Sequence, residues 1–140
     1  MQVTSFAQGA AIDAQINKLG LGGGGGGATS IGAHEAYQLC AHYFLNSVDS
    51  PNGVRKPIMF ITGDEFYYEE VVAGQVRKYL DPQYSGGTLS SVGVFRALAQ
   101  KYDVIHLHRS TDMYLDQDDA ICAQWEAVLG REEPWAVRSF

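Results

Sequence analysis

The sequence lacks several features that assign a chain to a specialised class of protein. No apolar run approaches the roughly 20 residues of a membrane-spanning helix. The first residues, MQVTSFAQGAAIDAQ, have neither the basic start nor the apolar segment of a signal peptide. The net charge of −6 argues against nonspecific attraction to nucleic acid or anionic membranes, because both need a cationic face. These absences predict a cytoplasmic protein without nucleic-acid or membrane partners.

Cysteine is scarce as well. The two cysteines, Cys40 and Cys122, fall within helical patterns and show no metal-binding spacing. We interpret both as reduced, buried side chains, which fits the cytoplasm. The chain also has no G-x-S-x-G nucleophile elbow and no cysteine beside a predicted strand end, so nucleophilic catalysis has little support.

Glycine, in contrast, is concentrated in the stretch GLGGGGGGATS at 20–30. A phosphate-binding loop needs a lysine where Ala28 stands, and it follows a strand, whereas a helix is predicted before this run. A flexible linker should separate two domains, but only about twenty residues precede the glycines. We therefore expect one domain, 1–140, in which the glycine run is a tight loop that presents Thr29 or Ser30.

Strand and helix patterns alternate along the chain. The apolar runs PIMFIT at 57–62 and DVIHLH at 103–108 predict strands covered on both faces, as in a parallel sheet. Residues 2–6 and 135–140 favour two further strands. Amphipathic spacing predicts helices over 10–19, 31–46, 69–80, 91–102 and 118–129, and Gly130 is expected to end the last of them. The helix over 31–46 is expected to turn one face inward, made of Ala33, Ala36, Tyr37, Cys40, Ala41 and Phe44. Such alternation indicates an α/β fold with a mainly parallel sheet.

Polar residues stand at the ends of the two apolar strands. Asp64 directly follows the first, so its carboxylate is expected at the carboxyl edge of the sheet, either as a ligand for a hard divalent cation or as the start of the next turn. His106 and His108 are two positions apart, hence on one face of the second strand. They fit either a shared transition metal or polar groups satisfied near a strand end.

Several of these stretches together resemble a known family. The glycine run, Glu35-Ala36-Tyr37 and KPIMFITGDE at 56–65 resemble the middle of a von Willebrand factor type A domain of the bacterial and phage branch. KYDVIHLHRS at 101–110 and AQWEAVLG at 123–130 resemble the next strand and helix of that branch. The resemblance extends over residues 2–130 and implies a three-layer Rossmann-like fold with a mainly parallel sheet.

The resemblance also implies a metal site. Such domains hold Mg²⁺ at the carboxyl edge of the sheet, and the matching positions here are Thr29 or Ser30, from the glycine-rich loop, and Asp64. The family's D-x-S-x-S element occurs nowhere in this chain, so the resemblance is to a partial domain that lacks the N-terminal strand carrying it. We expect magnesium binding to be weak or absent, because Mg²⁺ keeps its waters unless several anionic ligands converge.

The function implied by the resemblance is that of a non-catalytic protein-binding or scaffolding module. Without the family's central strands, the strand before Asp64 has an apolar edge, so we expect self-association or docking on a protein partner there. Two alternatives stay open. One is a small metal-assisted hydrolase that uses Asp64 with His106 and His108, and the other is a structural subunit of a larger, for example viral, assembly.

Overall fold

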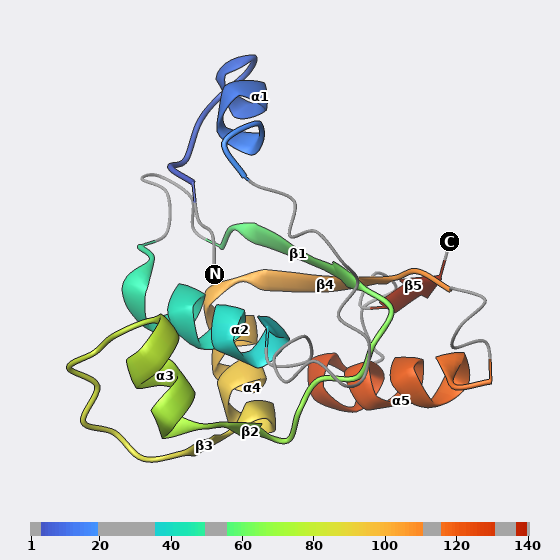
Figure 1. Ribbon diagram of the computed structural model, residues 1–140. Coiled ribbons are helices and arrows are strands. Elements are labelled where there is room, and N and C mark those ends of the chain that lie inside the picture. Colours follow the sequence, from blue (N-terminus) through green and yellow to red (C-terminus); the bar gives the residue numbers. More distant parts are fainter. Residues whose placement is uncertain (1–3, 20–35, 50–55, 111–115, 131–136, 140) are drawn as a thin grey trace. The chain divides into compact units, whose positions relative to one another are not determined.

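The structure, a computed structural model, describes residues 4–19, 36–49, 56–110, 116–130 and 137–139. The contacts between residues divide the chain into two compact units, 1–33 and 34–140. The described residues form helices and a small, mostly parallel sheet (Figure 1), which makes this a mixed α/β fold.

Among its described residues, 4–19, the first unit contains one short helix. Helix α1 (Ala11–Ile16) confirms the predicted helix over 10–19 in a shorter form. Its side chains Ile12 and Ile16 are both exposed. Residues 4–6 form no strand, so that part of the strand predicted over 2–6 is wrong. A strand needs a neighbour for its backbone hydrogen bonds, and no described strand pairs with these residues.

The second unit is built on a sheet of three parallel strands in the order β1-β4-β5. They are β1 (Ile58–Gly63), β4 (Asp103–His108) and β5 (Val137–Ser139), and they confirm the strands predicted over 57–62, 103–108 and 135–140. In the register of the central pair, Ile58 lies opposite Asp103 and Gly63 opposite His108.

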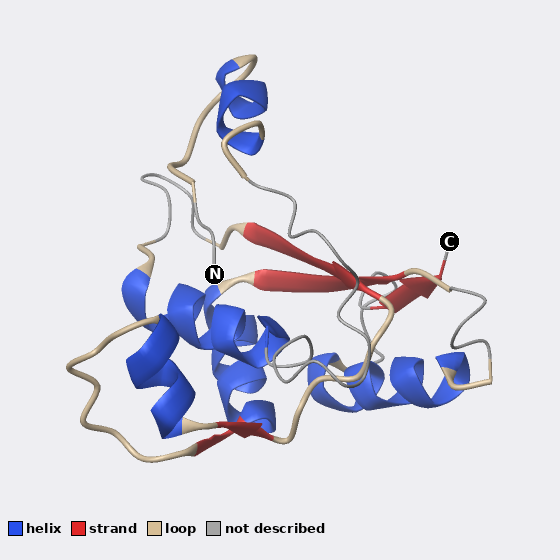
Figure 2. Cartoon of the chain, in the orientation of Figure 1, coloured by secondary structure: helices blue, strands red, loops and turns tan. Residues whose placement is uncertain are grey.

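A small antiparallel pair of strands accompanies this sheet. Strand β2 (Glu70–Val71) pairs with β3 (Leu89–Ser90), and helix α3 (Ala73–Tyr79) and an extended loop join them (Figure 2). The helix predicted over 69–80 therefore begins later than expected. Glu70 and Val71 form a strand instead, because they pair with Ser90 and Leu89 further along the chain.

Four helices lie on the same side of the main sheet (Figure 1). They are α2 (Ala36–Ser47), α3, α4 (Ser91–Lys101) and α5 (Asp118–Leu129), and the core between them and the sheet contains Trp125, Phe95, Leu98, Ile121, Val71 and Val76. Both helices α4 and α5 were predicted within a residue or two. Gly130 ends α5 as expected, with φ of 87°.

The inward face of α2 agrees only in part with the predicted one. Of the predicted residues, Ala41 is buried, and Tyr37, Cys40 and Phe44 are half-buried. The residues Gln38, Leu39 and His42, which lie outside the predicted face, are buried as well. At the end of this helix the Lys101 ammonium donates to several of the last carbonyl oxygens, including that of Phe44 at 3.1 Å. A cation at a helix C-terminus stabilises it, so α4 fixes the end of α2.

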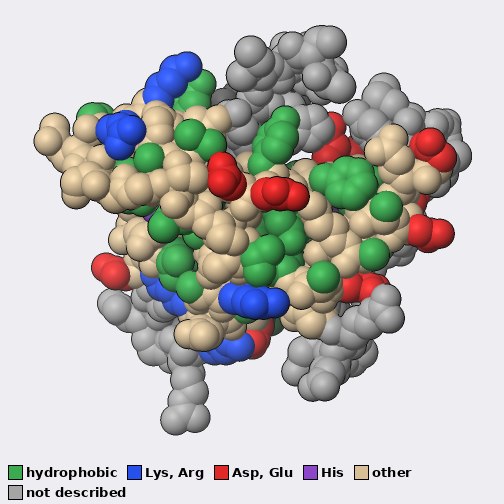
Figure 3. Space-filling model, turned by 90° about the horizontal axis from the view of Figure 1, so that it is seen from below, with side chains coloured by type: hydrophobic (Ala, Val, Ile, Leu, Met, Phe, Trp, Pro, Cys, Tyr) green, Lys and Arg blue, Asp and Glu red, His purple; other side chains and the backbone are tan. Residues whose placement is uncertain are grey.

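The side of the main sheet away from the helices is open at β1. Met59 and Ile61 pack against the core, but Ile58 and Phe60 on the other face are 61% and 60% exposed. The expectation that this strand is covered on both faces is therefore wrong. Seen from the side of the helices, hydrophobic, acidic and basic side chains are interspersed (Figure 3). None of the helices described is both long and apolar enough to cross a membrane.

Candidate functional site

The carboxyl ends of β1 and β4 lie side by side. Gly63 ends β1 opposite His108, the last residue of β4, and the Arg109 N–H donates to the Gly63 carbonyl oxygen at 3.1 Å. Asp64 follows at this edge and is half-buried. Because the strands are parallel, the residues after both of them gather at one edge of the sheet, as predicted.

Of the three predicted metal ligands, Asp64 lies among the described residues. Thr29 and Ser30 lie outside the described residues, so magnesium binding by Thr29, Ser30 and Asp64 stays a prediction. Within the described ranges, no three side chains of His, Cys, Asp or Glu come together as a metal-binding group. Asp64, His106 and His108 are all in those ranges, and they do not form such a group.

His106 is part of the core. It is fully buried, and its ring stacks on Trp125 of α5, with centroids 4.1 Å apart and planes 11° apart. Neither of its ring nitrogens has a hydrogen-bond partner in the described structure. Burial, together with the neighbouring His108, lowers the pKa of His106 to about 4. The side chain is therefore neutral at physiological pH and behaves as an aromatic core residue.

His108 joins the end of β4 to the start of α5. The fully buried imidazole lies with Nε2 2.9 Å from an oxygen of Asp118, the first residue of α5, and the Ser110 hydroxyl donates to the other oxygen of that carboxylate. The hydrogen bonds from Ser110 and from His108 lower the pKa of Asp118. In a hydrolytic triad the histidine lies between serine and aspartate, but here the aspartate lies between the other two. The arrangement positions a helix and does not activate the serine through the histidine.

Tyr37 of α2 occupies the end of β1. Its hydroxyl interacts with the backbone N–H groups of Asp64 and Glu65, while burial and the two nearby carboxylates raise the pKa of Tyr37 to about 12. The ring also makes an edge contact with Trp125, at a centroid distance of 5.4 Å. A Cβ atom on Gly63 would lie 1.6 Å from the Tyr37 hydroxyl oxygen. Glycine at this position is what allows the phenol to reach the strand end.

Helix α5 fixes the segment that follows β1. The indole Nε1 of Trp125 donates to the Glu65 carbonyl oxygen at 3.3 Å. The Gln124 side chain accepts from the Tyr67 N–H at 3.0 Å and donates to the Tyr67 carbonyl oxygen at 3.2 Å. The loop carrying Asp64 is thereby bonded to a helix that is itself bonded to β4.

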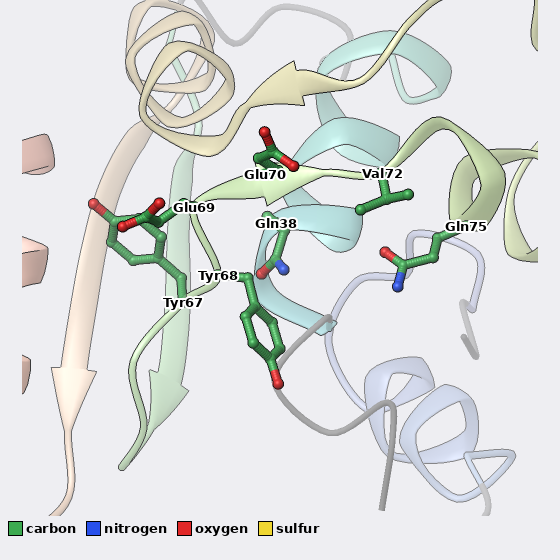
Figure 4. A pocket seen from close by; sticks show the side chains of 7 residues that line it. All are labelled: Gln38, Tyr67, Tyr68, Glu69, Glu70, Val72 and Gln75. Carbon is green, nitrogen blue, oxygen red and sulfur yellow. The ribbon is translucent and has the colours of Figure 1, made fainter.

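A cavity of about 480 Å³ lies near this loop. The side chains that line it come from α2, from the segment around β2 and from α3 (Figure 4), and they are Gln38, Tyr67, Tyr68, Glu69, Glu70, Val72 and Gln75. The amide group of Gln38 is fully buried and has no hydrogen-bond partner in the described structure. Asp64 is not among the described residues that line this cavity.

Comparison of the chain with models of protein families, with curated proteins and with solved structures finds no match.

Three residues of this edge carry roles that the sequence did not indicate. Tyr37 was expected on an inward helix face and within the resembling stretch Glu35-Ala36-Tyr37, Asp118 as the opening of a helix, and Ser110 only as the last residue of the stretch KYDVIHLHRS. The sequence offered one weak indication of this site, which is that Ser110 and Asp118 flank the connection between a predicted strand and the next helix. Nothing in the sequence showed that Tyr37 would reach the same place.

We expect Gly63→Ala to lower the free energy of unfolding by about 1–3 kcal/mol, as overpacking does, because the added methyl group meets the Tyr37 hydroxyl. Urea unfolding measures the change. Gly74→Ala is the control, since no atom lies within 4 Å of its added Cβ and alanine favours the helix by about 0.5–1 kcal/mol. In a Tyr37→Ala background the cost of Gly63→Ala should shrink, and equal costs in both backgrounds would contradict the contact.

We expect the free energy of unfolding to fall as the pH is lowered from 6.5 towards 4. His106 has a lowered pKa in the folded chain, so over this range the unfolded chain binds a proton that the folded chain does not, with a slope of at most about 1.4 kcal/mol per pH unit. His106→Phe keeps a ring against Trp125 and should reduce the slope. Burial also lowers the pKa of His42, so a smaller dependence should persist. If the free energy of unfolding of the unmodified chain and of His106→Phe changed equally with pH, the assignment of this dependence to His106 would be wrong.

Proposed function

We propose that this chain is a non-catalytic binding module of von Willebrand factor A type that acts in the cytoplasm. On this proposal it is a partial three-layer Rossmann-like domain, of which the described residues form the sheet and the helical layer on one side. It takes up an extended polypeptide as an additional strand beside β1. The observation that carries the proposal is the exposure of Ile58 and Phe60 on the end strand of the described sheet. Large apolar side chains on an edge strand favour pairing with another polypeptide.

The order of the described elements supports this assignment over an enzyme. Parallel strands with crossover helices are the arrangement that the resemblance implies, and the acidic residue after β1 stands at the carboxyl edge. The histidines that a hydrolase needs are instead used inside the core, one stacked on Trp125 and the other bonded to Asp118. A binding role also fits the loop after β1, which Gln124 and Trp125 fix in one place.

Site-specific photocross-linking tests the docking of a polypeptide on β1. We expect p-benzoylphenylalanine in place of Phe60 to give a covalent adduct in the cells that express the full chain, with the partner identified by mass spectrometry. The same group in place of Tyr79, which is 47% exposed on α3, should give none. Absence of any polypeptide adduct at position 60, or equal adducts at both positions, would contradict the proposal.

The magnesium site is a separate part of the proposal. Binding of Mg²⁺ by Thr29 or Ser30 and by Asp64 should be weak, because few anionic ligands take part. Calorimetric titrations should therefore give measurable heat only at millimolar metal. Asp64→Ala should abolish the heat, whereas Glu65→Ala, one residue further along, should keep it. No heat with the unmodified chain removes the metal from the proposal and leaves the binding of a polypeptide intact.

A further inference from the structure

The hydrogen bonds between β1 and β4 reveal which backbone groups of β1 face outward. The Asp103 N–H donates to the Pro57 carbonyl oxygen at 2.9 Å, and the Arg109 N–H donates to that of Gly63 at 3.1 Å. In a parallel ladder, every second residue directs its polar backbone groups to the same neighbour. The residues between them, Ile58, Phe60 and Thr62, therefore direct their N–H and C=O groups away from β4.

No proline interrupts this outward row. Pro57, which has no N–H, belongs to the set of residues that faces β4, so it does not block the edge in the way that an edge proline usually does. Each of the three outward residues keeps a donor and an acceptor. Of the strands that the structure describes, none lies on this side of β1.

If two copies of this segment are paired antiparallel about Phe60, each residue meets a residue of matching kind in the other copy. Two positions away, Ile58 faces Thr62, and both are β-branched residues that favour strands. Four positions away, Lys56 faces Asp64, a cation opposite an anion. Between these positions Met59 faces Ile61, and both pack against the core on the helical side of the sheet.

We infer that the polypeptide that adds to β1 is the β1 strand of a second copy of this chain, in an antiparallel dimer whose two-fold axis passes at Phe60. This inference rests on the proposed docking at β1 and names the occupant. Residues that face each other across an antiparallel pair share one face of the sheet. Phe60 lies opposite the partner's Phe60, and Ile58 lies opposite the partner's Thr62.

This register satisfies the backbone and the charges together. The outward residues of one copy meet the outward residues of the other, so each facing pair exchanges both of its N–H···O bonds. Lys56 is 43% exposed and already bonded to Asp103 at 2.7 Å, and in the dimer its ammonium lies between that carboxylate and the partner's Asp64. The same charges disfavour a shift of the register, because a two-residue shift in either direction takes Lys56 away from this carboxylate.

Disulfide trapping between two single-cysteine variants tests the register. A hydrogen-bonded antiparallel pair has Cα atoms about 5.5 Å apart, within the range of a disulfide. Mixing Ile58→Cys with Thr62→Cys under mild oxidation should therefore give a covalent dimer on a non-reducing gel. Each variant alone should give none, because its two cysteines are offset by about 13 Å along the strands. Both positions are exposed, so neither change disturbs the core.

The unmodified chain, oxidised in parallel, shows how much cross-linking arises from Cys40 and Cys122 themselves. Light scattering on the unmodified chain should give twice the mass of 15.3 kDa, and Phe60→Lys should halve it. A monomer by light scattering with no trapped dimer in the mixture overturns the inference, as does equal trapping of either variant alone. If position 60 then captures a different polypeptide in cells, the proposed function stands and only the dimer fails.

Discussion

The parallel pairing of β1 with β4 is the constraint on which the rest of this structure depends. It places the end of one strand beside the end of the other, so that Gly63 faces His108. The segments that leave the two strands then meet the same helix, α5, through Trp125 on one side and Asp118 on the other. If the register slipped by one residue, the side chains of β4 would exchange faces and the histidines would leave the core.

The core accepts this arrangement at an electrostatic cost. Two imidazoles lie next to each other with ring centroids 6.2 Å apart, fully buried among aromatic rings. His108 is bonded to the carboxylate of Asp118, whereas among the described residues His106 contacts the face of Trp125, the edge of Tyr37 and the ring of His108. A neutral imidazole is tolerated there because a stacked ring recovers packing energy, but a charged one would lose its hydration without a partner. His106 at this strand end is therefore a neutral residue that packs in the core.

In the same pairing, the face of β1 that points away from the helices is exposed. Hydrophobic side chains on that strand alternate between the core and the open face, so the strand is buried on one side only. The sequence pattern of PIMFIT is equally compatible with burial on both faces, which is why it did not predict the exposure of Phe60. Local patterns report which residues are apolar, and the neighbours that cover them come from elsewhere in the chain. The start of α3 was misjudged for a related reason, since Glu70 and Val71 pair with distant residues.

The sequence by itself determined the strand over 103–108, the helix that Gly130 ends, and the placement of Asp64 after an apolar strand in an α/β chain. These follow from short-range periodicity and from the conformational freedom of glycine, which act within a few residues. Only the tertiary structure decided that Tyr37 lies over Gly63, that Asp118 bonds His108, and that one face of β1 stays open. Each of these depends on which segments pack together across long stretches of chain, and hydrophobic burial selects those partners by shape and not by any signal in the local sequence.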